Sequence, residues 1–119
     1  MRRSIEILAN TGSDMNKTGD KAKSDSYYGY TDGIHSVSIK YNAFVGTVKL
    51  QASLSLNPAE ADWGDIKLIT KPTAHTGTEI HTFKGNYVYI RTIVDRSAVG
   101  DGSTYETAYG VISQVTLSN

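Results

Sequence analysis

The sequence predicts a small all-β domain, a single antiparallel β-sandwich or jelly roll of about 7–8 strands. Short runs of alternating apolar and polar residues recur along the chain, with Gly, Pro and Asn between them. Thr and Tyr suit a half-buried pleated surface, and the chain contains 8 Tyr. The strong helix formers Ala, Leu and Glu are concentrated nowhere. The 119 residues are expected to form one domain, residues 1–119, because domains cluster at roughly 100–150 residues.

The balance of charges and the absence of cysteine exclude several classes of function. The chain has 12 basic and 12 acidic residues, whereas a general polyanion binder is clearly basic, so we expect no nucleic-acid partner. It contains no Cys, which excludes disulfide frameworks and thiolate metal sites. No stretch approaches the roughly 20 apolar residues of a membrane span, and the apolar run at residues 5–9 is too short for a signal peptide. We expect a product made in a cytoplasm, with no membrane partner.

The N-terminal third is expected to contain two strands and a long loop. Residues 4–9 alternate weakly and predict a first strand. Residues 10–26 are polar and lack periodicity, which predicts a long polar loop that a partner could order. Residues 34–41 alternate clearly, so we expect a strand with Val37 and Ile39 on its buried face.

The clearest pattern spans residues 44–54. Its even-numbered residues, from Phe44 to Leu54, are almost all apolar and its odd-numbered residues are mostly polar, so a period of two predicts a strand. Pro58 ends this strand, and one helical turn is expected before Trp63 begins the next strand. We expect Trp63 to be a buried plug in the core.

The strand that begins at Trp63 is expected to end at Pro72, and a short strand follows at residues 80–83. Residues 87–94 are apolar on both faces except at Arg91 and Thr92. This pattern predicts a central strand covered on both sides, or one that faces a neighbouring subunit.

The C-terminal segment is expected to contain a loop and a closing strand. Residues 95–110 are rich in Gly and Tyr and predict a second loop. Residues 111–117 predict the last strand, with Val111, Val115 and Leu117 facing inward.

Three residues close in sequence, His75, Glu79 and His81, are of types that ligate zinc or nickel. Glu79 and His81 would share one face of a strand. No third strong ligand has a fixed place, so the sequence favours a solvated strand edge, and we expect no cofactor. His35 is expected to lie half-exposed at the rim of its strand.

The polar loop matches part of a calcium-binding loop. Asp14, Asn16, Thr18 and Gly19 occupy its first, third, fifth and sixth positions, and Asp25 occupies its twelfth. Asp25 is one methylene shorter than the usual Glu, several Lys side chains would oppose a cation, and neither flank reads as a helix. The sequence therefore favours a solvated loop.

Three acidic residues, Glu60, Asp62 and Asp65, cluster around Trp63, an arrangement also found in glycosidases. Here they surround a turn, where acidic residues serve solubility and local capping. The chain contains no nucleophile-elbow, P-loop or dinucleotide-binding motif. We expect no catalytic residues and no enzymatic activity.

Several tyrosines lie in or beside Gly-containing loops or on the strand at residues 87–94. Tyr presents a large rigid area and a hydroxyl group at low entropic cost, so such residues are typical of contact surfaces. The alternative is that some of them cover the ends of the core. The interface candidates are Tyr27, Tyr28, Tyr30, Tyr87, Tyr89, Tyr105 and Tyr109.

Two strand sequences carry a resemblance to a known group of proteins. Residues 44–54 read Phe-Val-Gly-Thr-Val-Lys-Leu-Gln-Ala-Ser-Leu, with Pro58 and Asp62-Trp63 after them, and residues 83–91 read Phe-Lys-Gly-Asn-Tyr-Val-Tyr-Ile-Arg. With the closing strand at 110–117, this pattern resembles small virion structural proteins of tailed bacteriophages, notably T4-like phages of marine bacteria.

This resemblance covers about residues 34–117. It implies a β-sandwich that forms part of the particle as a capsid decoration, neck, tail or baseplate component, and it supplies no catalytic residues. The expected location is the virion, and the expected partners are copies of this chain and other virion proteins, bound through loops and one sheet face. The alternative from another class is a β-sandwich that binds a surface glycan or receptor, with Trp63 and the loop tyrosines stacking on sugar rings.

Overall fold

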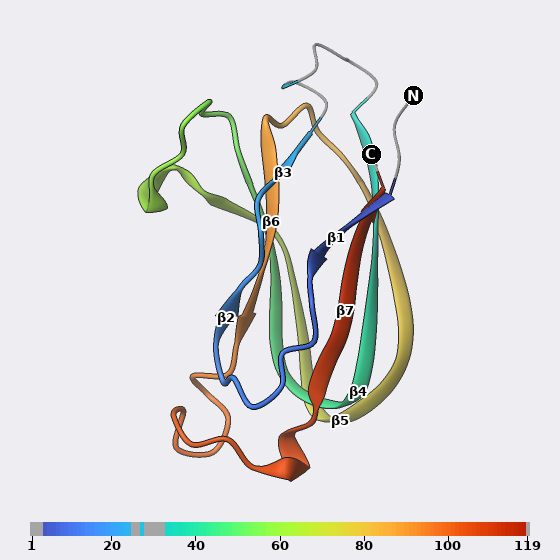
Figure 1. Cartoon of the computed structure of the whole chain (residues 1–119), viewed down its shortest axis with the longest axis vertical. Helices are drawn as coiled ribbons and strands as arrows, with labels where there is room; N and C mark the ends of the chain where they lie inside the picture. The colour runs from blue at the N-terminus through green and yellow to red at the C-terminus, as the bar shows by residue number, and fades with distance from the viewer. Residues whose placement is uncertain (1–3, 25–26, 28–32, 119) are drawn as a thin grey trace.

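The computed structural model describes residues 4–24, 27 and 33–118, and these residues form an antiparallel all-β fold (Figure 1). Two short 3-10 helices, η1 (Glu60–Asp62) and η2 (Thr107–Tyr109), lie in the connections between strands. The strands are β1 (Ser4–Leu8), β2 (Lys17–Thr18), β3 (Ala22–Lys23), β4 (Ile34–Ser53), β5 (Gly64–Lys84), β6 (Tyr89–Asp95) and β7 (Val111–Ser118).

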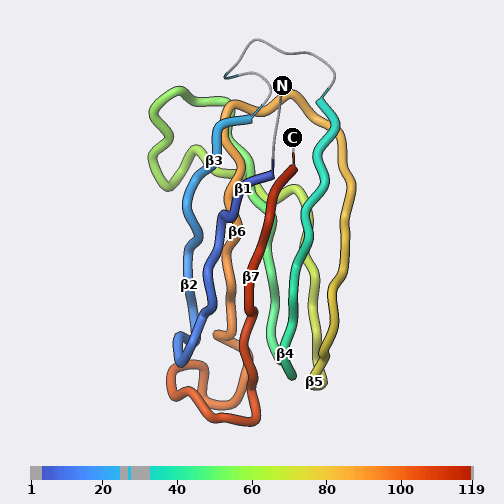
Figure 2. The backbone as a smooth tube through the Cα atoms, turned by 45° about the vertical axis from the view of Figure 1, so that its right-hand side comes forward, coloured from blue at the N-terminus to red at the C-terminus, as the bar shows by residue number. Residues whose placement is uncertain are grey.

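Strand β4 is continuous in pairing but sharply bent. A straight strand of its 20 residues would be roughly 65 Å long, whereas the longest dimension of the molecule is 43 Å. The bend lies at Asn42 and Ala43, where Ala43 has a φ of 53° and the pairing register shifts. Buried residues of β4 are odd-numbered before this bend and, apart from the terminal Ser53, even-numbered after it. The two strands predicted at residues 34–41 and 44–54 are therefore the two arms of one bent strand (Figures 1 and 2).

Strand β5 follows β4 around the same bend. The prediction that Pro72 ends the strand is wrong, because β5 continues to Lys84. Its pairing with β4 passes from Gly46↔Lys71 to Phe44↔His75, so Pro72 falls in the bent segment between two paired positions. Proline is tolerated at such irregular points of an edge strand, where its missing N–H breaks no ladder hydrogen bond.

The strands pair like one long hairpin: the segments near the two termini pair with each other, and the pairs come closer together in sequence towards the middle of the chain. Ser4 pairs with Ser118, Lys17 with Val94, Ile34 with Lys84, and Ala52 with Gly64. One sheet has the order β1, β7, first arm of β4, second arm of β5. The other has the order first arm of β5, second arm of β4, β6, then β2 and β3. All seven strands belong to one continuous antiparallel sheet, which the bends of β4 and β5 fold into these two layers, and this agrees with the predicted β-sandwich or jelly roll.

The two sides of the sandwich differ. On one side the backbone joins the sheets, because Asp20 N donates to Ile7 O at 2.9 Å and Gly19 N donates to Thr92 O at 2.7 Å. On the other side lie the two arms of β5, which among the described strands pairs with β4 alone. We call this second side, lined by the inward side chains of β5, the open side.

The core lies between the sheets and follows the predicted alternation. At the end of β4 the alternation stops, because Ser53 is buried and Leu54, beyond the last residue of the strand, exposes 70% of its surface. Strand β6 is central, since it pairs with β4 on one edge and with β2 and β3 on the other, as its pattern predicted. The fully buried apolar side chains include Val37, Ile39, Phe44, Val48, Leu50, Ile90, Val94, Ile112, Val115 and Leu117.

Two expectations about local structure are wrong. The predicted loop at residues 10–26 contains β2 and β3, and Thr11 is buried with its Oγ1 accepting a hydrogen bond from Ile112 N at 3.1 Å. These strands are only two residues each, too short for an alternating pattern. In β7, Ile112 is fully buried in place of the half-buried Val111, because the pairing of β7 with β4 shifts register at Tyr41.

Candidate functional site

The open side is lined by polar side chains that point between the sheets. Glu79 and His81 pair with Ile39 and Val37, whose side chains are fully buried. Residues directly opposite each other in a sheet share a face, so Glu79 and His81 point inward. Lys71 points inward from the other arm of β5 by the same reasoning, since its partner is the buried Gly46.

Glu79 is the centre of a cluster on the open side. Its Oε2 lies 2.5 Å from Lys71 Nζ and 3.3 Å from His75 Nε2. Its Oε1 accepts a hydrogen bond from the Tyr41 hydroxyl at 3.2 Å and lies 3.3 Å from His81 Nε2. The structure thus brings together the three residues predicted as candidate metal ligands, and it adds Lys71 and Tyr41, which the sequence did not single out.

The charges of this cluster are arranged to neutralise the carboxylate. The hydrogen bond from Lys71 lowers the pKa of Glu79 below its ordinary value, and partial burial opposes that shift. Burial and the nearby Glu79 charge raise the pKa of Tyr41. Because an ammonium group sits where a cation would bind, the cluster is an ion-pair network, and no metal-binding group of three His, Asp or Glu is found among the described residues.

The lowered pKa of Glu79 predicts a loss of stability in acid. A group whose pKa is depressed by folding contributes stability above its ordinary pKa, and that contribution falls as the pH drops towards and through the folded value. In urea titrations, Glu79→Gln is expected to be less stable than the wild type at about pH 7, and the difference should shrink at about pH 3. A difference that does not depend on pH would contradict the assigned network.

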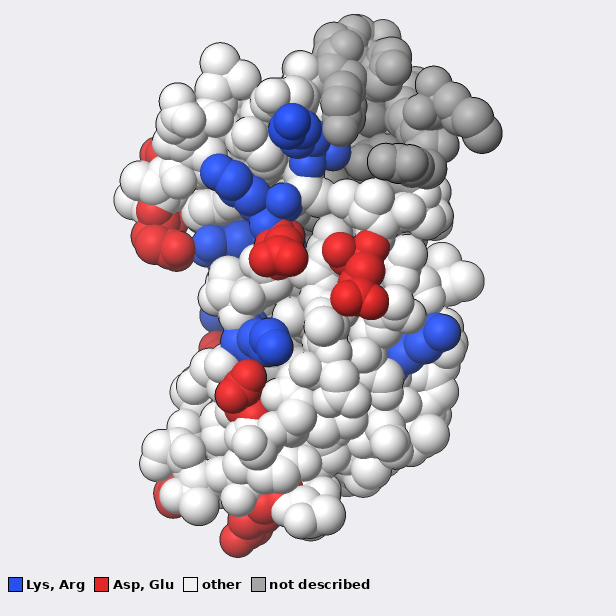
Figure 3. All heavy atoms as spheres, viewed as in Figure 1, with Lys and Arg blue, Asp and Glu red and all other residues white. Residues whose placement is uncertain are grey.

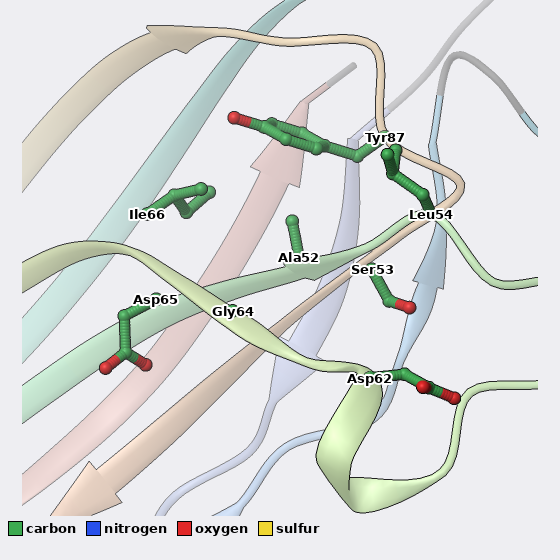
Figure 4. A pocket seen from close by; sticks show the side chains of 8 residues that line it. All are labelled: Ala52, Ser53, Leu54, Asp62, Gly64, Asp65, Ile66 and Tyr87. Carbon is green, nitrogen blue, oxygen red and sulfur yellow. The ribbon is translucent and has the colours of Figure 1, made fainter.

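An apolar pocket of about 350 Å³ opens at one end of the sandwich, where β4 ends and β5 begins. We call this depression the end pocket (Figure 4). Its apolar walls are Ala52, Leu54, Ile66 and Tyr87. The remaining lining residues are Ser53, Asp62, Gly64 and Asp65.

The carboxylates beside the end pocket already have partners. Asp62 Oδ2 accepts a hydrogen bond from Ala59 N at 2.8 Å, and Asp65 Oδ1 accepts one from Gln51 Nε2 at 2.8 Å. Figure 4 shows both carboxylates pointing away from Tyr87. The arrangement caps η1 and supports β4, so it does not form a pair of carboxylates facing a bound substrate.

Trp63 is not the core plug that the sequence predicted. It is half-buried, and the guanidinium of Arg91 lies 4.3 Å from the centroid of its ring. Trp63 comes one residue before β5, in a connection that stands away from the sandwich (Figure 1). The cation covers one face of the indole, so a sugar could stack only on the other face.

Arg91 anchors this connection to the central strand. It is buried, and its Nη1 and Nη2 donate to the two carboxylate oxygens of Glu60 at 3.2 and 2.9 Å while its Nε donates to Gln51 Oε1 at 2.9 Å. This bidentate geometry is the strongest form of Arg–carboxylate contact. The hydrogen bond from Arg91 lowers the pKa of Glu60. In the sequence, Arg91 is a charged residue within the apolar run at residues 87–94, and such a residue indicates a buried charge that needs a partner.

The tyrosine candidates lie at both ends of the molecule. Tyr87 lines the end pocket, and Tyr89 is buried at the start of β6 with the exposed Tyr27 against it, 5.7 Å between ring centroids. Tyr105 and Tyr109 form a T-shaped pair at 6.5 Å in the β6–β7 connection, at the opposite end in Figure 1. Tyr28 and Tyr30 lie outside the described residues.

The described polar residues of the candidate calcium loop each have another partner. Asp14 is paired with Lys17 at 3.8 Å, and Asn16 Oδ1 accepts a hydrogen bond from Arg96 N at 2.9 Å. Thr18 pairs with Ile93 in the sheet, and Asp25 lies outside the described residues. His35, expected at the rim, is fully buried with its Nε2 2.7 Å from Gly85 O.

Arg96 is a buried residue that the sequence did not reveal. Its guanidinium lies 4.6 Å from the Phe44 ring centroid, and Nη2 donates to Gly110 O at 2.8 Å. Burial lowers its pKa. Arg96 therefore fixes the β6–β7 connection to the bend of β4 from within the core.

No family model matches this chain, and no curated protein matches it at a significant level. Among the described residues, no helix is long and apolar enough to cross a membrane.

Proposed function

We propose that the chain is a non-catalytic structural module of a bacteriophage particle, a capsid decoration, neck, tail or baseplate component. In this proposal it is made in the host cytoplasm and binds other virion proteins and copies of itself. The resemblance of residues 44–54 and 83–91 to small virion proteins supports the particle context. The jelly roll supports it as well, because capsid proteins commonly use this architecture.

The end pocket is the observation that carries the binding role. Leu54, which lines the pocket, and Leu56, two residues further along the chain, expose 70% and 66% of their surfaces, and Ile66 and Tyr87 add further apolar area. Apolar groups gathered around a depression on a small domain mark a contact surface. On the face in Figure 3, basic and acidic side chains are interspersed, so charge of one sign does not set the partner there.

Removing the exposed leucines should weaken incorporation into particles. The double variant Leu54→Ser, Leu56→Ser should fold normally, because exposed apolar side chains contribute little to stability, and its copy number per particle should fall about tenfold or more. Quantitative mass spectrometry of purified particles measures this. Ile5→Ser, on β1, is the control and should leave the copy number unchanged. Particles that lack even the wild-type chain would refute the proposal.

The second candidate is a glycan- or receptor-binding module, favoured by Tyr87 in a pocket that also contains the hydroxyl group of Ser53. An aromatic ring beside polar groups suits a sugar, whose faces are apolar and whose rim is hydroxylated. A glycan array would show binding that is lost in Tyr87→Ala while the variant remains folded. An array without hits for the wild type would exclude this candidate.

A further inference from the structure

The edge of β5 that faces away from β4 is the longest strand edge without a partner among the described residues. Both views place β5 at the outer margin beside β4 (Figures 1 and 2). Such an edge presents unpaired backbone groups and invites pairing with another chain unless the sequence protects it. Natural edges are protected by Lys, Pro, bulges and charged residues.

The two arms of β5 differ in this protection. The first arm contains Asp65 and Lys67 and ends at Pro72, while its Lys71 is held by Glu79 and does not count as protection. The second arm, residues 76–84, reads Thr-Gly-Thr-Glu-Ile-His-Thr-Phe-Lys; it contains no Pro, and its one Lys is Lys84, the last residue of β5. Thr, Ile and Phe also favour strands. The middle of the second arm, residues 76–83, is therefore the less protected part of this edge, and we call the second arm the unguarded arm and the first arm the guarded arm.

The one acidic charge in the second arm is already neutralised. Glu79 points inward and is held by Lys71, His75 and His81. A carboxylate that is satisfied within its own chain does not repel an approaching strand as a free one would. The network on the open side thus leaves the edge available for pairing.

The outward face of the second arm has an apolar centre. Ile80 exposes 70% of its surface, with Thr78 and Thr82 on either side of it. On the neighbouring arm of β4, Ser38 lies opposite Ile80, and Ser36 Oγ is 3.0 Å from Thr82 Oγ1. Lys40 lies opposite Thr78 at the margin of this patch. An exposed Ile flanked by the hydroxyl groups of Thr78 and Thr82 suits a contact in which two sheets become continuous.

We propose that a second copy of the chain pairs antiparallel with this edge, about a two-fold axis at Ile80. A two-fold axis normal to the sheet leaves every side chain on its own face of the sheet. Residues that lie opposite each other must therefore have sequence numbers that differ by an even number, because side chains alternate between the faces. The axis then passes between two copies of the same residue. With Ile80 on the axis, the two Ile80 side chains meet, and Thr78 lies opposite Thr82 of the partner subunit. Glu79 then lies opposite His81 of the partner subunit, which continues the Glu79–His81 pairing across the interface.

This inference deepens the proposed function, because it names the surface through which copies of the module meet. One strand pair buries a small area, so the dimer alone should be weak, with a Kd in the micromolar range or above. Such a contact becomes effective where many copies are held together on a particle.

Analytical ultracentrifugation over a concentration series tests the pairing. The wild type should show a concentration-dependent dimer, and Ile80→Lys should raise the Kd at least tenfold. Leu68→Lys is the matched control: Leu68 also exposes 58% of its surface on β5 but lies on the guarded arm, so its Kd should be unchanged. A wild type that is monomeric up to about 1 mM, or equal effects of the two substitutions, would overturn the proposal.

Cross-linking supplies a second measurement, because the chain contains no Cys. Ile80→Cys should form an intermolecular disulfide under mild oxidation, since the Cα atoms of opposite residues on antiparallel strands lie about 4.5–5.5 Å apart, within the range that a disulfide spans. Leu68→Cys should not. If the wild type is found in particles at its normal copy number but shows no dimer and Ile80→Cys forms no disulfide, only the β5 contact is overturned. If the wild type dimerises through β5 but is absent from particles, only the proposed function is overturned.

Discussion

Replacing Phe44 by Ala is expected to lower the free energy of unfolding by about 3–5 kcal/mol. Phe44 is fully buried just after the bend of β4, where its ring lies 5.8 Å from that of Tyr41 and 4.6 Å from the Arg96 guanidinium. The substitution leaves a cavity and removes the aromatic face that lies against a buried cation. Both losses act in the same direction.

Urea denaturation monitored by circular dichroism measures the effect of Phe44→Ala. Val45→Ala is the matched control, because Val45 is the next residue on the opposite, half-buried face, and we expect it to cost less than about 1 kcal/mol. Equal losses for the two variants would contradict the assignment of Phe44 to the inner face and of Val45 to the outer face.

The second large effect is expected at Gly110, where substitution by Ala should cost on the order of 3 kcal/mol or more. Gly110 has a φ of 63°, a left-handed conformation that favours Gly. A Cβ there would lie 2.2 Å from Ala43 O and 2.3 Å from Asn42 O. These atoms are backbone at the bend of β4, so they cannot move aside without disturbing the turn between the two sheets.

Gly64→Ala is the control for Gly110→Ala. A Cβ at Gly64 meets no atom within 4 Å, and its φ lies outside the left-handed region. We expect Gly64→Ala to change stability by no more than about 1 kcal/mol, with a small gain from the reduced entropy of the unfolded chain. Thermal unfolding of the two variants is the measurement. A clash specific to Gly110 would lower the melting temperature of Gly110→Ala alone, whereas a general intolerance of Ala at Gly positions would lower both melting temperatures.

The alternation of residues was sufficient to predict most of the sheet. It assigned the buried face of both arms of β4 and the covered position of β6. The alternation also marks the position of the bend, because the buried residues change from odd-numbered to even-numbered between Tyr41 and Phe44. It failed at β2 and β3, which have two residues each, and at Pro72, which lies in the bend of β5.

The candidate sites were less predictable, because they depend on residues that meet only after folding. His75, Glu79 and His81 were singled out by type and spacing, but Lys71 joins them because β5 bends between Lys71 and His75. Trp63 was expected in the core, yet Arg91 on another strand holds it at the margin. The buried Arg96 gave no local signal, because its partners come from β4 and from the connection before β7.

The sequence by itself determined the class of fold, the inner faces of the two arms of β4 and the absence of cysteine chemistry. These follow from composition and from a period of two, which are local properties of the chain. Only the tertiary structure decided that β4 and β5 bend together into two sheets, and that β5 is left at an edge with one guarded and one unguarded arm. Strand order and register depend on pairing between distant residues, whose free energy no single segment of the sequence contains.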